Sequence, residues 1–179
     1  MAGIDNVSAP FVYGSLMGGL FQNYQSEDKP VASLLSGYEY LVAVIEDPPG
    51  TYCNKVYGQI NRVASGFRSA IDNADVFGWT SASASTTHLI QRNGDGTCSV
   101  FENTTLSDPA AAIDVSSWSG IIQVAAAPNA VFGRKSDGTV VASGLTAGWC
   151  DLDQLDGLFV DSIVACNHAQ RVAFHIDRS

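Results

Sequence analysis

The stretch that decides the fold is Arg92-Asn-Gly-Asp-Gly-Thr97, which recurs without a gap as Arg134-Lys-Ser-Asp-Gly-Thr139, 42 positions later. A second phrase keeps the same spacing, because Ala70-Ile71-Asp72 returns as Ala112-Ile113-Asp114. A fixed period of this length is typical of repeat proteins, in which each repeat is one supersecondary unit. The spacing predicts repeats at residues 70–111 and 112–153, and a shortened one at residues 154–179.

The last repeat rests on weaker anchors. Leu155-Asp156 follows Ile113-Asp114 at the same spacing, and Phe174 follows Phe132 in the same way. Each repeat contains an apolar run, a short strand, and in the first two an Asp-Gly pair followed by another strand. Asp-Gly between apolar runs is a hairpin signal, because glycine adopts positive φ without steric cost. We therefore expect Asp95-Gly96 and Asp137-Gly138 to form equivalent tight turns.

The expected fold class is all-β, built from short strands punctuated by Ser, Gly and Pro. Strands are predicted near residues 88–91, 97–101, 130–133, 139–142 and 172–174. Residues 1–69 are expected to form a diverged N-terminal β segment, with strands at 10–14, 40–45 and 55–60, a turn at 47–51 and a short helix within 63–74. Because no linker rich in Pro or Gly interrupts the chain, we expect one continuous domain.

Residues 121–144 resemble a repeat of the RCC1 type (regulator of chromosome condensation), including the bacterial RCC1-like repeats of surface-associated proteins. The shared features are an apolar run ending in small residues, a strand, Asp-Gly-Thr and a returning strand. The resemblance implies propeller blades, of which this chain has room for about four at this repeat length, hence a partial propeller. The family's Trp before the final Gly is Ser143 here. A β-trefoil is the structural alternative.

The charge balance argues against a nucleic-acid partner. The chain has 9 Lys and Arg against 18 Asp and Glu, giving a formal net charge of -9. Nucleic-acid binding needs basic side chains that neutralise phosphates, so no nucleic-acid partner is expected. No segment is apolar for long enough to insert into a membrane, and no signal peptide is visible. We expect a protein that is cytoplasmic, or exported without a cleavable signal.

The four cysteines form no Cys-x-x-Cys pair, which disfavours a zinc site. Whether Cys150 and Cys166 form a disulfide is left open. Asp151-Leu-Asp-Gln-Leu-Asp156-Gly157 gathers carboxylates before a glycine, but its spacing misses the calcium-loop pattern by one residue. We interpret it as a solvated loop between blades, and predict no metal and no cofactor.

Four residues are the candidate binding residues. Trp118 and Trp149 stand in Ser- and Gly-rich connections, where aromatic side chains anchor protein or glycan partners. Asp151 and Asp153 follow the second of them. The competing interpretation is that the tryptophans fill the space between blades. No catalytic residue is predicted.

The favoured function is therefore a non-enzymatic binding protein that recognises a protein or glycan through the loops of a β-repeat scaffold. One rival is a small enzyme, because Pro10-Phe-Val-Tyr-Gly-Ser-Leu-Met-Gly-Gly19 resembles the opening of γ-glutamyl cyclotransferase-like proteins, whose Tyr13-Gly14-Ser15-Leu16 loop would hold substrate. That family's glutamate base is missing from the expected window. The other rival is an inhibitor or immunity protein whose acidic surface meets a basic enzyme.

A repeat protein buries its core only between neighbouring repeats. The last predicted repeat contains no third strand, which leaves an open sheet edge at residues 172–176. We therefore expect a homodimer, or a subunit of a larger assembly.

Overall fold

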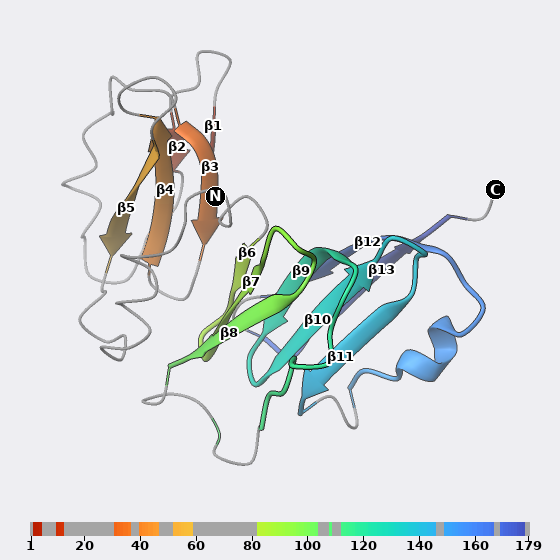
Figure 1. Ribbon diagram of the computed structural model, residues 1–179. Helices are drawn as coiled ribbons and strands as arrows, with labels where there is room; N and C mark the ends of the chain where they lie inside the picture. The colour runs from red at the N-terminus through yellow and green to blue at the C-terminus, as the bar shows by residue number, and fades with distance from the viewer. Residues whose placement is uncertain are drawn as a thin grey trace.

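The computed structural model describes residues 2–4, 10–12, 31–36, 40–46, 52–58, 82–103, 108, 112–145, 149–166 and 169–177. Within these ranges the chain consists of small antiparallel sheets and one short 3-10 helix (Figure 1). The all-β prediction is confirmed. No helix among the described residues has the length and apolar character needed to cross a membrane.

The N-terminal part contains two sheets, drawn red to orange in Figure 1. The first pairs β1 (Ala2–Ile4) with β2 (Pro10–Val12), and the second is a three-stranded meander of β3 (Val31–Ser36), β4 (Tyr40–Glu46) and β5 (Tyr52–Gly58). The strands predicted at 40–45 and 55–60 are β4 and β5. The predicted helix within 63–74 and the turn at 47–51 lie outside the described residues.

The repeat region contains two further meanders and a final pair of strands. Its elements are β6 (Ala82–Ala84), β7 (His88–Arg92), β8 (Cys98–Glu102), β9 (Ile121–Ala127), β10 (Ala130–Lys135), β11 (Val140–Gly144), η3 (Leu152–Leu155), β12 (Val160–Ala165) and β13 (Val172–Ile176). The sheet orders are β6-β7-β8, β9-β10-β11 and β12-β13. Each sheet packs against the next one along the chain, with β9 against β6 and β7, and β12 against β9 and β10.

The sequence repeat holds in the register of the first two of these sheets. His88 pairs with Glu102 in β7–β8, and Ala130 pairs with Gly144 in β10–β11, each residue 42 positions after its counterpart. The first strands agree as well, because Ala84↔Leu89 corresponds to Ala126↔Val131. The repeat is therefore a three-stranded antiparallel unit.

The two Asp-Gly turns are equivalent, as predicted. Gly96 and Gly138 both have φ of 81°, in the region that favours glycine. In each turn the aspartate Oδ1 accepts hydrogen bonds from the backbone N and the Oγ1 of the threonine two residues later. These bonds lower the pKa of Asp95 and of Asp137, because they favour the charged carboxylate.

Each turn also anchors the next sheet. The carbonyl oxygen of Gly96 accepts a hydrogen bond from Ile121 N at 3.0 Å, where β9 begins. The carbonyl oxygen of Gly138 accepts one from Val160 N at 3.1 Å, where β12 begins. The Asp-Gly phrase thus fixes two things, the hairpin within one sheet and the start of the following sheet.

Two apolar clusters lie between the sheets of the repeat region. The first joins β6–β8 to β9–β11 around residues that include Ile90, Val124 and Val131. The second joins β9–β11 to β12–β13 around Phe132, which is fully buried. Burying such a side chain contributes about 1.5–3 kcal/mol, so stability resides in the contact between sheets.

The period changes in the last repeat, and one sequence anchor is wrong. The pair Ala165↔Val172 takes the place of Ala126↔Val131. Ala165 therefore follows Ala126 by 39 positions, and Val172 follows Val131 by 41. Phe174 is consequently not the counterpart of Phe132. The two rings meet edge to face across the second cluster, with centroids 6.3 Å apart.

Candidate binding site

Trp118 is not an exposed anchor. Its side chain is 6% exposed and belongs to the first apolar cluster. It lies over Gly133 so closely that a β-carbon there would stand 2.8 Å from the Trp118 ring. Trp118 therefore fills the space between two sheets, which was the competing interpretation of the sequence.

Trp149 is half-buried at the edge of the second cluster. Its ring meets Phe132 edge to face, with centroids 5.8 Å apart. Its Nε1 donates a hydrogen bond to the carbonyl oxygen of Leu145 at 2.7 Å. Because both the ring and the polar nitrogen have partners within the chain, Trp149 supports the neighbouring segment rather than offering a broad stacking surface.

That neighbouring segment is η3, and the two predicted aspartates begin it. Asp151 is its N-cap, and its Oδ1 accepts a hydrogen bond from Asp153 N at 3.1 Å. Its Oδ2 accepts one from Gln154 Nε2 at 3.3 Å. Asp151 is therefore committed to the turn, whereas the exposed Asp153 side chain lines a groove.

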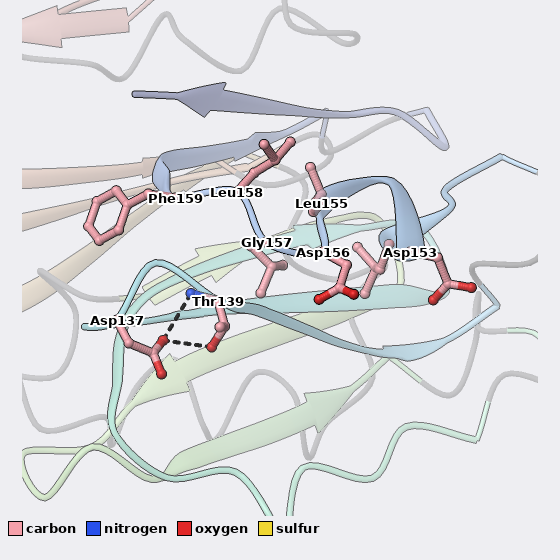
Figure 2. A pocket seen from close by; sticks show the side chains of 10 residues that line it. Asp137, Thr139, Asp153, Leu155, Asp156, Gly157, Leu158 and Phe159 are labelled. Atoms are coloured by element: carbon pink, nitrogen blue, oxygen red, sulfur yellow. Dashed lines mark hydrogen bonds between the residues drawn. The ribbon is translucent and has the colours of Figure 1, made fainter. Parts of the chain in front are cut away.

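This acidic groove has a volume of about 620 Å³ and lies between the Asp137 turn, the start of β11, and the chain from η3 to β12 (Figure 2). Its apolar part includes Leu155, Leu158 and Phe159. The remaining lining residues are Asp137, Thr139, Val140, Leu152, Asp153, Asp156 and Gly157.

Three carboxylates and two exposed apolar side chains give the groove its character. Asp137, Asp153 and Asp156 are all exposed. Leu158 and Phe159 are 43% and 46% exposed, whereas the next residue, Val160, is fully buried at the start of β12. In Figure 2 the Phe159 ring lies at the Asp137 end, and Asp153 and Asp156 lie along the other end.

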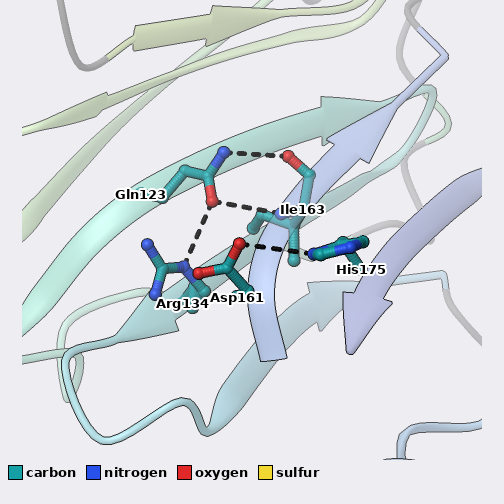
Figure 3. A network of polar contacts seen from close by, with 5 residues as sticks. All are labelled: Gln123, Arg134, Asp161, Ile163 and His175. Atoms are coloured by element: carbon teal, nitrogen blue, oxygen red, sulfur yellow. Dashed lines mark hydrogen bonds and ion pairs between the residues drawn. The ribbon is translucent and has the colours of Figure 1, made fainter. Parts of the chain in front are cut away.

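The wall of the groove that leads into β12 is held by a polar clamp (Figure 3). The side-chain amide of Gln123 on β9 bonds both backbone groups of Ile163: its Oε1 accepts from Ile163 N at 3.0 Å, and its Nε2 donates to Ile163 O at 3.1 Å. Gln123 Oε1 also accepts a hydrogen bond from Arg134 Nε at 3.2 Å. The clamp and the Gly138–Val160 bond together fix β12 on the preceding sheet.

No group of three or more His, Cys, Asp or Glu side chains within the described ranges is arranged to hold a metal ion. Asp151, the first carboxylate of the calcium-like phrase, is used as a helix cap. Cys150 and Cys166 are both free thiols, so the disulfide left open by the sequence is not formed.

One end of this groove is predictable from the sequence, and the other is not. Asp153 is one of the candidate binding residues of the sequence, whereas Asp156 stands out only as part of the segment that resembles a calcium loop. Leu158 and Phe159 were missed, although a Leu-Phe pair between two acidic residues, Asp156 and Asp161, is an available signal. Tyr13–Leu16, the loop of the cyclotransferase-like resemblance, lies outside the described residues.

A scan of protein-family models and a search of curated proteins find no match to the sequence. Solved structures with a similar fold do exist. One is the ectodomain of the receptor kinase CR4 from Physcomitrella patens, with a TM-score of 0.56 and 14% identity over 93% of this chain and 44% of the other. Another is the CRINKLY WD40 ectodomain of the Arabidopsis thaliana receptor kinase ACR4, with a TM-score of 0.53 and 14% identity over 90% of this chain and 50% of the other.

The chain therefore spans about half the length of these ectodomains. At such low identity the likeness shows the fold alone. Together with the stacked three-stranded sheets, it identifies an all-β arrangement of the propeller type and favours the propeller prediction over the β-trefoil.

Proposed function

We propose that the chain is a non-enzymatic, protein-binding module whose acidic groove takes a basic segment that also carries apolar side chains. The observation that supports this most is the composition of the groove, with three exposed aspartates around exposed Leu158 and Phe159. An extended peptide that alternates Arg or Lys with Leu or Val matches both features.

Charge supports a basic partner. The whole chain has a formal net charge of -9, so its field attracts cations at long range and raises their association rate. One oxygen of Asp137, Oδ1, is used by Thr139, and Asp153 and Asp156 extend the negative rim. Arginine and lysine are the side chains that pair with such carboxylates.

The apolar residues of the groove would contribute binding free energy beyond that of the exposed ion pairs. Exposed salt bridges contribute only about 0.2–1 kcal/mol each. Covering Leu158 and Phe159 removes apolar surface from water, at roughly 25 cal/mol per Å². A protein segment supplies apolar and basic groups together. A glycan is less suited, because both predicted stacking tryptophans are occupied within the chain.

The finer assignment to RCC1-type repeats belongs to this proposal as well. It is supported by the two equivalent Asp-Gly-Thr turns and by the shared register of the two three-stranded sheets. The module binds its ligand through the connection between two sheets, which corresponds to a loop between blades.

The test uses a fluorescently labelled peptide of alternating Arg and Leu, titrated with the full chain and read by anisotropy. A peptide of alternating Glu and Leu is the matched ligand control. We expect binding of the Arg peptide that weakens as salt rises, because screening reduces the attraction between exposed charges. Equal binding of the Glu peptide would contradict the proposed recognition.

Variants locate the site. The double substitution Asp153→Asn and Asp156→Asn should weaken binding by about three- to tenfold, as expected for two exposed ion pairs. Asp161→Asn, an exposed aspartate outside the groove, is the matched control and should leave binding unchanged. If both variants bind the Arg peptide like the unaltered chain, the groove is not the binding site.

A further inference from the structure

Among the described residues, the last sheet lacks the strand that completes each of the two sheets before it. In those sheets the middle strands β7 and β10 pair on one side with β6 or β9, and on the other with β8 or β11. β13 takes the position of the middle strand, since its register with β12 matches that of β10 with β9. Within the described part of the chain, β12 is its single partner.

The hydrogen bonds show which backbone groups face this edge. Cys166 N donates to Arg171 O, and Asp177 N donates to Phe159 O. Because the direction of backbone groups alternates along a strand, Ala173 and His175 also direct theirs toward β12. The N–H and C=O groups of Val172, Phe174 and Ile176 consequently point away from β12, toward the position that β11 fills beside β10.

Two antiparallel copies of this edge strand place compatible side chains opposite each other. In an antiparallel pair of two copies centred on Phe174, Val172 lies opposite Ile176 and Phe174 lies opposite its own copy. Arg171 lies opposite Asp177, so opposite charges meet at both ends. Cross-strand pairs of apolar, aromatic and oppositely charged residues are those that stabilise antiparallel sheets.

The registers of side chains and backbone agree with this pairing. Val172 and Phe174 pack against the second apolar cluster, and Ile176 shares their face of the strand, so the apolar pairs would form on the cluster side. Arg171 and Asp177 lie on the opposite face and are exposed. The residues whose backbone groups point outward are those that would exchange hydrogen bonds with the partner strand.

We propose that two copies of the chain associate through β13, strand against strand, about a two-fold axis at Phe174. The result is a continuous sheet in the order β12-β13-β13-β12 across the two copies. Two-fold dimers are the commonest symmetric oligomers, and pairing with a second copy covers an open sheet edge. This association is independent of the acidic groove and of its ligand.

Sedimentation equilibrium over a range from micromolar to millimolar tests the proposal on the full chain. We expect reversible formation of a dimer from an 18.9 kDa monomer. Arg171→Glu places like charges at both ends of the paired strands and should raise the dissociation constant by about tenfold. Arg171→Asp combined with Asp177→Arg exchanges the charges and should restore the original value to within about threefold.

A backbone variant separates pairing from folding. Ile176→Pro removes an outward N–H, so it should abolish the dimer while the monomer keeps the β12–β13 bonds and a cooperative unfolding transition. His175→Pro removes an inward N–H and should instead destabilise the monomer. A chain that stays monomeric throughout, or a dimer that neither Arg171→Glu nor Ile176→Pro weakens, would overturn the proposal.

Discussion

The β9–β11 sheet and the β12–β13 sheet pair their first two strands in the same register. They differ in the burial of one face, which in the β9–β11 sheet packs against β12. In the β9–β11 sheet this face carries Phe132 and Ala125, which are 0% and 3% exposed beneath β12. In the β12–β13 sheet the corresponding residues are Ala173, which is exposed, and Val164, which is 64% exposed. The strand pairing is therefore repeated in the two sheets, whereas the burial of the corresponding side chains is not.

Two residues on this exposed face of the β12–β13 sheet are small or polar. The position of Phe132 holds a small residue in Ala173, and His175 beside it is exposed and lies 3.3 Å from the Asp161 carboxylate. Among the described residues no further sheet packs on this face, so small and polar side chains there are compatible with contact with water. The comparison teaches that register is set by turns and strand pairing, whereas the role of a repeat is set by the side chains on its outer face.

The largest effect expected from this comparison concerns the two phenylalanines of the second cluster. Phe132→Ala removes a fully buried ring and should lower the free energy of unfolding by about 3–5 kcal/mol. Phe174→Ala removes a half-buried ring from the terminal sheet and should cost roughly half of that. Urea denaturation measures both. A larger loss for Phe174→Ala would mean that β13 contributes more to the core than its burial indicates.

A second comparison tests the equivalence of the two turns. Gly138→Val should cost about 1–3 kcal/mol through strain at positive φ. It also places a β-carbon 2.5 Å from the ring of the partly exposed Phe159, so this ring must shift. Gly96→Val should cost at least as much, because the nearest atoms there belong to the backbone of Gly120. Thermal unfolding at matched pH provides the measurement, and tolerance of Val at both positions would refute the turn assignment.

The smallest effect is a pH dependence that originates in the β6–β8 sheet. Burial lowers the pKa of His88 below its usual 6.5, with Glu102 opposing that shift. The neutral form is favoured in the folded state, so stability is full above pH 6.5 and declines as pH falls toward the lowered folded pKa. His88→Gln should remove this part of the decline. If the stability of the variant and of the unaltered chain falls in parallel below about pH 6.5, the buried histidine is not its source.

The sequence predicted the backbone of the repeat region better than its surface. Asp95-Gly96 and Asp137-Gly138 specify local turn chemistry, so their geometry follows from adjacent residues alone. The prediction that Phe174 is the counterpart of Phe132 was wrong. Strand side chains alternate between faces, so a one-residue change of spacing moves an aromatic ring to the other side of the sheet. Spacing cannot reveal this change where the loops on either side differ in length.

The candidate binding site was predictable only in part, for a related reason. Asp153 is visible as a carboxylate in a polar connection, and η3 brings it to the groove. Trp118 lies in an equally polar connection but faces inward, because Gly133 on β10 leaves room for its ring. A contact between residues on neighbouring elements does not appear in the composition of either segment.

The central claim is that the terminal sheet repeats its neighbour but ends, within the described part of the chain, at a strand with one open edge. Residue-resolved amide hydrogen exchange, followed by NMR at a dilution where the chain is monomeric, tests it most directly. In β10, which is paired on both sides, all amides should exchange slowly. In β13 the outward amides of Val172, Phe174 and Ile176 should exchange fast and those of Ala173 and His175 slowly. Slow exchange at every residue of β13 in the monomer would contradict the account, because the edge would then be covered within a single chain.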